Sequence, residues 1–189
     1  MRRLLYTVLT GLALLISLGV TSATAQAAAF PSTVIATTSG IPRCIGPLNG
    51  GTADGTPLVL ANCAGASQLW HGTGGNTPDR SVRHVSGKCL SLAVTSSPVP
   101  VGTRLVLRDC SGVVQGDQQW TFVALTPGGL DRIWVLRNGP SLRCATVSGG
   151  GTSFGTPLVL QNCSFRFEQQ WVLANPPSTY GFSFDDGLA

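Results

Sequence analysis

The segment GTPLVLQNC at residues 155–163 has two close copies earlier in the chain, GTPLVLANC at residues 55–63 and GTRLVLRDC at residues 102–110. Each copy follows an earlier cysteine that has a basic residue just before it, and each precedes a Gln-x-Trp triplet. The tryptophans of these triplets are Trp70, Trp120 and Trp171. This regular spacing, about 50 residues, predicts three equivalent structural repeats.

Each repeat has the pattern of a β-structure. Leu-Val-Leu is a short apolar, partly β-branched run that begins after Gly-Thr and ends near a cysteine. Entering strands are expected at residues 34–37, 82–85 and 133–136, and turns with positive φ at residues 50–51 and 149–151. About four strands per repeat give about twelve in all. Because one repeat cannot bury a core alone, the three are expected to close around a shared axis.

Six cysteines allow fifteen disulfide pairings in principle. Only one of these treats the three repeats alike, and it pairs Cys44 with Cys63, Cys89 with Cys110, and Cys144 with Cys163. Each bridge closes a loop of about twenty residues, which stabilises the fold by roughly 3 kcal/mol in the chain-entropy description. No Cys-x-x-Cys pair is present, so neither zinc nor thioredoxin-type redox chemistry is indicated.

The N-terminus predicts export. Arg2 and Arg3 precede an uncharged apolar run at residues 4–20, and small-residue cleavage patterns follow at residues 23–27. This is the layout of a secretory signal peptide, which we place at residues 1–27. A membrane anchor is the alternative, but no basic cluster follows the apolar run. We therefore expect a secreted, extracellular protein whose cysteines are oxidised.

Charge is sparse in the rest of the chain. Without Arg2 and Arg3, ten basic residues stand singly against eight acidic ones. No basic stripe could follow a phosphate backbone, so nucleic acid is not an expected partner. No later segment is apolar enough to enter a bilayer, so no membrane contact is expected after cleavage. We expect a monomer.

Three copies of Cys, Leu-Val-Leu-x-x-Cys and Gln-x-Trp resemble the ricin B-chain-type lectin domain. The resemblance covers about residues 32–175, and we place the domain at residues 28–175. The resemblance implies an all-β fold, a β-trefoil with a six-stranded barrel capped by three hairpins. It also implies galactose-type or xylan-type ligands, with one shallow site in each repeat. The Gln-x-Trp tryptophans would then pack in the core. Their glutamines, Gln68, Gln118 and Gln169, would bind neighbouring backbone behind any sugar site.

Members of that family bind a sugar with four side chains per repeat, three polar ones that include the groups for its hydroxyls and an aromatic one for the apolar side of its ring. They are an Asp two residues after the first cysteine, a Gln and an aromatic before the second, and an Asn before Gln-x-Trp. The first repeat instead has Gly46, Val59, Ala61 and Ser67. The second has Ser91, Val106, Arg108 and Asp117. The third has Thr146, Val159, Gln161 and Glu168. The pattern that builds the scaffold is intact, whereas the pattern that binds the ligand is replaced.

Altered polar groups leave candidate sites in two repeats. Binding at millimolar Kd requires about 4 kcal/mol, and the first repeat has almost nothing to supply it. In the second repeat, Ser91, Arg108 and Asp117, with Gln118 behind them, could bind a polar or acidic glycan. The favoured alternative is that Arg108 and Asp117 pair on the surface. An open hollow at these residues would support binding, and a filled one would not. In the third repeat the candidates are Thr146, Gln161 and Glu168.

Aromatic residues add a second possibility in the third repeat. Phe154, Phe165 and Phe167 could stack on a sugar or form a patch for a protein partner. They could also be covered by the C-terminal tail, residues 176–189, which contains Tyr180, Phe182 and Phe184.

The sequence thus predicts a secreted carbohydrate-binding module with degenerate sugar sites, whose partner is an extracellular glycan or polysaccharide. The alternative is a secreted β-trefoil protein-interaction or inhibitor module that binds another secreted protein and no sugar. No catalytic set is evident, so no enzyme, cofactor or metal is expected. The only histidines, His71 and His84, are interpreted as surface-loop residues.

Overall fold

The structure, a computed structural model, describes residues 33–38, 40–72, 81–111, 116–125 and 132–174. This part of the chain is all β, with short 3-10 turns and no α-helix. The predicted signal peptide and C-terminal tail lie outside the described residues. So do the outer bounds of the predicted domain.

Each repeat contributes four strands, so twelve are present, as predicted. The first repeat has β1 (Thr33–Thr37), β2 (Cys44–Pro47), β3 (Leu58–Ala61) and β4 (Leu69–Gly72). The second has β5 (Val82–His84), β6 (Cys89–Leu92), β7 (Leu105–Arg108) and β8 (Trp120–Ala124). The third has β9 (Ile133–Asn138), β10 (Cys144–Val147), β11 (Leu158–Gln161) and β12 (Trp171–Ala174). The 3-10 turns are η1 (Leu48–Gly50), η2 (Ala66–Gln68), η3 (Gly116–Gln118), η5 (Ser148–Gly150) and η6 (Phe167–Gln169).

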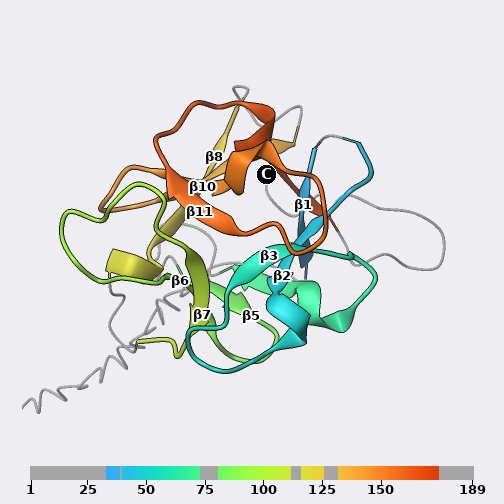
Figure 1. Cartoon of the computed structure of the whole chain (residues 1–189), viewed down its shortest axis with the longest axis horizontal. Helices are drawn as coiled ribbons and strands as arrows, with labels where there is room; N and C mark the ends of the chain where they lie inside the picture. Colours follow the sequence, from blue (N-terminus) through green and yellow to red (C-terminus); the bar gives the residue numbers. More distant parts are fainter. Residues whose placement is uncertain (1–32, 39, 73–80, 112–115, 126–131, 175–189) are drawn as a thin grey trace, which may run out of the picture.

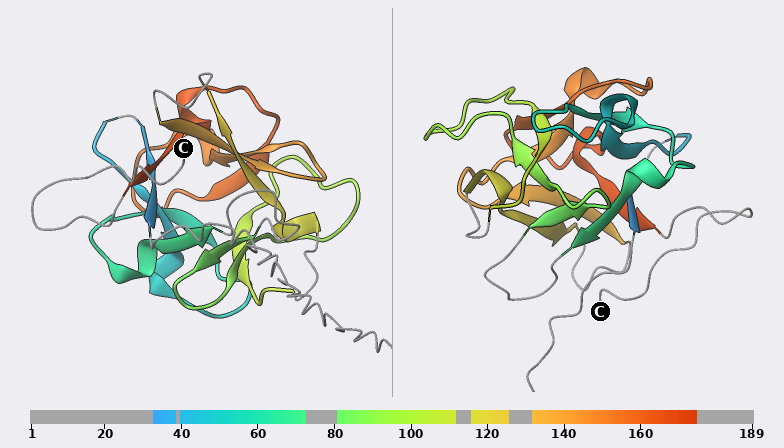
Figure 2. Two further views of the ribbon diagram at one scale, coloured as in Figure 1. Left: turned by 180° about the vertical axis from the view of Figure 1, so that it is seen from behind. Right: turned by 90° about the horizontal axis from the view of Figure 1, so that it is seen from below.

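The strands form a barrel with three hairpins. Antiparallel pairing runs from β8 through β9, β12, β1 and β4 to β5. The hairpins β2–β3, β6–β7 and β10–β11 are arranged around a common centre (Figure 1). Seen from behind, β1 and β12 lie side by side, so the last strand of the chain closes on the first (Figure 2). This is the predicted β-trefoil.

The Gly-Thr that opens each repeated segment joins one repeat to the next. The glycine N–H donates to a leucine carbonyl of another repeat at 2.8 Å, in the pairs Gly55 with Leu107, Gly102 with Leu160, and Gly155 with Leu60. Each leucine N–H returns a bond to the threonine carbonyl, at 2.8–2.9 Å. All three glycines have φ between 79° and 85°, the region that glycine adopts without a steric penalty. The motif is therefore kept because it closes the threefold ring.

The core is built from equivalent residues of the three repeats. The first and last residues of each Leu-Val-Leu run are at most 1% exposed. Trp70, Trp120 and Trp171 are at most 3% exposed, as predicted. Their indole N–H groups donate to the carbonyls of Ile45, Leu90 and Ala145 at 2.9, 2.9 and 3.4 Å. Buried indoles need such a partner, so the tryptophans fix the position of each hairpin on the barrel.

The predicted disulfide pairing is confirmed. Each bridge joins the first residue of the first hairpin strand to a cysteine two residues beyond the end of the second strand, in the pairs Cys44–Cys63, Cys89–Cys110 and Cys144–Cys163. The paired Cα atoms lie 5.0–5.1 Å apart. No described cysteine is free. Each repeat is thus cross-linked within itself.

The basic residue before the first cysteine of each repeat contacts the preceding repeat. Arg43 Nε donates to the carbonyl of Thr152 in the third repeat, at 3.2 Å. Lys88 Nζ lies 2.6 Å from carboxylate oxygens of Asp54, in the first repeat, and of Asp109. Hydrogen bonds to these two carboxylates raise the pKa of Lys88. Arg143 in turn donates to the carbonyl of Val99 in the second repeat.

The interpretation of the histidines as surface-loop residues was wrong. Both lie in strands, and the His84 ring is 2% exposed with its edge toward Trp70. Its Nε2 lies 2.8 Å from the Ser67 carbonyl, and its Nδ1 accepts from the Ser86 N–H at 3.2 Å. A neutral ring with its proton on Nε2 satisfies both contacts. Burial lowers the pKa of His84 below its usual value.

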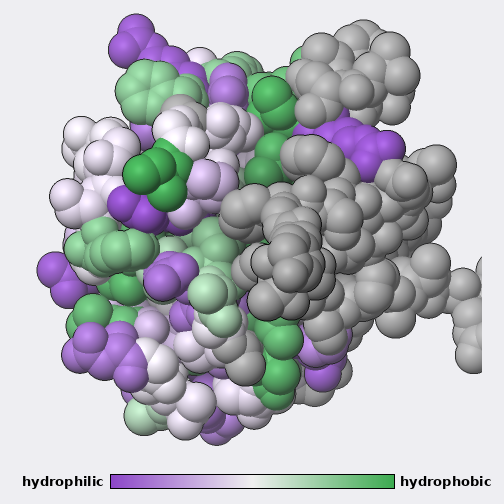
Figure 3. All heavy atoms as spheres, turned by 90° about the vertical axis from the view of Figure 1, so that its right-hand side faces the viewer, coloured by the Kyte–Doolittle hydropathy of each residue, from purple (hydrophilic) through white to green (hydrophobic). Residues whose placement is uncertain are grey.

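On the surface of the described residues, polar groups are interspersed with apolar ones. Hydrophilic residues alternate with hydrophobic ones over the face shown in Figure 3. The described residues include no group of three or more His, Cys, Asp or Glu that could hold a metal ion. They also include no helix long and apolar enough to cross a membrane.

Candidate functional site

A buried pair of polar side chains underlies the predicted site in the third repeat. Gln169 Nε2 donates to Thr146 Oγ1 at 2.9 Å and to the Asn162 carbonyl at 2.9 Å. Its Oε1 accepts from the N–H groups of Ser164 and Phe165, at 2.7 and 3.1 Å. The glutamine therefore uses its full amide to bind the end of the hairpin, and its role is structural as predicted.

Above this pair lies an open hollow of about 310 Å³, here named the third-repeat hollow. The polar side chains that line it are those of Thr146, Gln161, Asn162, Ser164, Glu168 and Gln169. Strands β10 and β11 place Thr146 and Gln161, and turn η6 places Glu168. The structure thus brings together all three residues that the sequence singles out in this repeat.

Glu168 supplies the carboxylate of the hollow. Its side chain is half-buried and makes no hydrogen bond or ion pair within the described part of the chain. Two of its neighbours, Gln161 and Asn162, carry amides that both donate and accept. A free carboxylate next to amides and hydroxyls can bind a pair of vicinal sugar hydroxyls, because each hydroxyl donates one bond and accepts another.

The second repeat has an equivalent pair of polar side chains, Ser91 and Gln118. Ser91 is fully buried, donates to the Cys89 carbonyl at 3.1 Å and accepts from Gln118 Nε2 at 3.0 Å. Arg108 Nη2 donates to the Ala93 carbonyl at 2.8 Å, and Asp117 is 9% exposed. No ion pair between Arg108 and Asp117 is found among the described residues. Ser91 therefore has no surface to offer a ligand, and the expected surface pair has not formed either.

The first repeat lacks the polar pair altogether. Gly46 stands where the other repeats have Ser91 and Thr146, so Gln68 has no hydroxyl partner at this position. Gln68 Nε2 donates to Ser67 Oγ at 2.7 Å, and its buried Oε1 has no partner. A Cβ added at Gly46 would lie only 3.0 Å from the Gln68 side chain, which occupies the vacated space. The loss of a sugar site in this repeat stays a prediction.

Two residues of the third-repeat hollow were missed by the sequence analysis. Asn162 and Ser164 flank Cys163 directly, and both line the hollow. Their position on either side of a cysteine whose disulfide partner was predicted could have identified them as candidate site residues. The three candidate aromatics, Phe154, Phe165 and Phe167, are 56%, 54% and 55% exposed among the described residues. The Arg43 guanidinium lies over the Phe154 ring, 4.0 Å from its centre. The tail that could cover these rings lies outside the described residues.

Comparison with known proteins places the chain in a family. The ricin-type beta-trefoil lectin domain matches residues 32–171, which include all three repeats. The chain belongs to this family. No curated protein matches the sequence.

Solved structures of ricin-type lectins and related β-trefoils share the fold. ThreeFoil, a designed threefold symmetric protein, is 24% identical with a TM-score of 0.64, over 75% of this chain and 96% of its own. A ricin B-like lectin of Macrolepiota procera, solved with lactose, is 19% identical with a TM-score of 0.58, over 78% and 96%. An exo-beta-1,3-galactanase from Clostridium thermocellum is 17% identical with a TM-score of 0.64, over 75% of this chain but only 29% of the enzyme.

Proposed function

We propose that this protein is a secreted carbohydrate-binding module whose third repeat is its working sugar site. The observation that carries the proposal is the third-repeat hollow, where Gln161, Asn162 and the unpaired Glu168 converge. Charge-assisted hydrogen bonds contribute about 1.5–3 kcal/mol each. Two such bonds to Glu168 supply most of the roughly 4 kcal/mol that millimolar binding requires. The carboxylate that the family takes from an Asp would here come from η6.

A glycan array probed with the oxidised protein lacking residues 1–27 tests this function. Wild type is expected to bind at least one glycan. Glu168→Gln keeps the size of the side chain and removes its charge, so we expect it to weaken binding at least tenfold. An array that stays blank at high protein concentration would overturn the proposal.

The asparagine just before the second cysteine, present in the first and third repeats, provides a matched control. Asn162 lines the hollow, whereas Asn62 holds the same place in the first repeat and accepts from the Ala64 N–H at 3.1 Å. We expect Asn162→Ala to weaken glycan binding and Asn62→Ala to leave it unchanged. Arg108→Ala tests the second repeat in the same assay, and its retained binding would dispose of a site there.

The proposed role is binding without catalysis. Glycoside hydrolysis by side chains normally uses a pair of carboxyl groups. Among the described lining residues of the hollow, Glu168 supplies one. Incubation of the module with any glycan it binds should release no reducing sugar. The bound partner would be an extracellular glycan or polysaccharide, with no nucleic acid or membrane involved.

Secretion and the monomeric state belong to the same proposal. The signal-peptide pattern in residues 1–27 supports export, and N-terminal sequencing of the released protein should begin close to Ala28. Light scattering is expected to give the mass of one chain.

The exposed phenylalanines favour a second candidate function. Phe154, Phe165 and Phe167 all lie in the third repeat and are more than half exposed. Large exposed apolar side chains that gather on one face mark interaction surfaces. A secreted β-trefoil that binds or inhibits another secreted protein would show a blank glycan array. Its binding to that protein would be lost in Phe165→Ala, which leaves the third-repeat hollow unaltered.

A further inference from the structure

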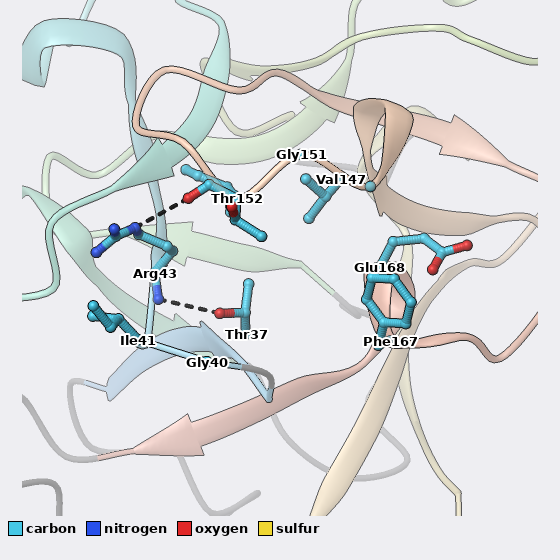
Figure 4. A pocket seen from close by; sticks show the side chains of 11 residues that line it. Thr37, Gly40, Ile41, Arg43, Val147, Gly151, Thr152, Phe167 and Glu168 are labelled. Carbon is cyan, nitrogen blue, oxygen red and sulfur yellow. Dashed lines mark hydrogen bonds between the residues drawn. The ribbon is translucent and has the colours of Figure 1, made fainter.

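A second hollow, of about 230 Å³, lies between the third repeat and the first, and we name it the inter-repeat hollow (Figure 4). Phe167 and Glu168 of η6 form one wall. The segment between β1 and β2 forms the opposite wall with Ile41 and Arg43. It therefore exists only because the barrel brings the last repeat back beside the first.

The inter-repeat hollow adjoins the third-repeat hollow. Val147, Gly150 and Glu168 line both of them. In Figure 4 the Glu168 carboxylate turns to the side away from Arg43, while the stem of the side chain faces the inter-repeat hollow. A molecule bound to the carboxylate in one hollow would thus extend past Glu168 into the other.

The lining of the inter-repeat hollow combines apolar and polar groups. Phe167 is 55% exposed and Ile41 is 73% exposed. Arg43 is held by the Thr152 carbonyl and the Phe154 ring, and it forms no ion pair among the described residues. Thr37 and Thr152 add polar groups between the two walls. An aromatic ring packs on the apolar face of a sugar, and fixed polar groups can bind its hydroxyls.

From this geometry we propose that the inter-repeat hollow binds the second sugar of an oligosaccharide whose first sugar occupies the third-repeat hollow. This inference rests on the proposed function. The ligand class is then a glycan chain of at least two linked sugars rather than a monosaccharide. Residues of the first repeat, which has lost its own site, take part in binding at the third.

Paired sugars of different length test the inference. Methyl α-D-galactoside is the monosaccharide probe and lactose the longer one. Any array glycan that wild type binds is also measured beside the monosaccharide at its end. Phe167→Ala is expected to weaken the longer chain about tenfold and to leave the monosaccharide unchanged, since Phe167 does not line the third-repeat hollow. Phe165→Ala is the matched control, because that ring is equally exposed and lines neither hollow.

A second variant separates ligand contact from local distortion. Phe167 lies two residues from Gln169, whereas Ile41 is in the first repeat and far along the chain from η6. Ile41→Ala should also lower the affinity for the longer chain alone. Equal losses for both sugar lengths, or no loss in either variant, would overturn the inference and leave the proposed function standing. A wild type that binds no sugar, with Glu168→Gln identical to it, would overturn both.

Discussion

Gln169 donates from Nε2 to Thr146 Oγ1 at 2.9 Å, and Gln118 makes the same bond to Ser91 Oγ at 3.0 Å in the second repeat. The hydroxyls occupy the place where the family has an aspartate. Each hydroxyl accepts a hydrogen bond from the amide of its glutamine, so the amide is held in place whether or not a sugar is present.

Thr146→Val removes this hydroxyl while keeping the shape of the side chain. The free energy of unfolding is expected to fall by about 1–3 kcal/mol, because one N–H of the buried Gln169 amide loses its partner. Urea denaturation measures the change. Thr52→Val, at an exposed position, should stay within about 0.5 kcal/mol of wild type. A Thr146 variant as stable as the Thr52 variant would contradict the assigned role.

Gln118→Ala and Gln169→Ala should destabilise the protein more than Gln68→Ala. The side chains of Gln118 and Gln169 each make four hydrogen bonds. The side chain of Gln68 makes one and leaves its Oε1 buried without a partner. At about 1 kcal/mol for each bond lost, this difference of three bonds predicts a gap in unfolding free energy of about 3 kcal/mol. Thermal or urea unfolding of the three variants provides the comparison. Equal losses would show that the three repeats hold their glutamines alike.

The predictable part of the fold was the part that the repeats encode. Equivalent cysteines and tryptophans occupy equivalent places, so their pairing and burial follow from the register of the sequence alone. The Gly-Thr motif was visible, but its task of joining one repeat to the next was not, because those bonds link residues about 50 positions apart. His84 was misjudged because a single polar residue in a short strand gives no periodic signal of burial.

The site was predictable only in part, for a similar reason. Thr146, Gln161 and Glu168 could be aligned with family positions, and they do meet in one hollow. The burial of Ser91 depends on packing that sequence position does not report. The inter-repeat hollow joins Ile41 to Phe167, which are in different repeats and share no motif.

Acid should weaken the fold through His84. Burial holds the pKa of this ring below the value of about 6.5 expected in the unfolded chain. The stability from the buried neutral ring is therefore complete above about pH 6.5 and declines as the pH falls, because the unfolded chain then takes up a proton that the native protein does not. Urea midpoints at pH 7.5 and 5.5 measure the decline. His84→Phe should reduce it, and an unchanged slope in His84→Phe would contradict this account.

Removal of the second-repeat disulfide should cost about 3 kcal/mol. Cys89 and Cys110 are separated by 21 residues, and their bridge constrains that loop in the unfolded chain. The double variant Cys89→Ala/Cys110→Ala should therefore unfold at a lower urea concentration than wild type. The third-repeat hollow contains neither cysteine, so any glycan binding should survive under folding conditions. Loss of binding without loss of structure would argue against independent repeats.

Val34 and Ala174 are ladder partners in the antiparallel β1–β12 pair. The backbone therefore enters and leaves the barrel at neighbouring points. A short linker between these points, with the chain opened between β4 and β5, is expected to give a circularly permuted protein with the same barrel. The barrel would then form whichever repeat comes first along the chain.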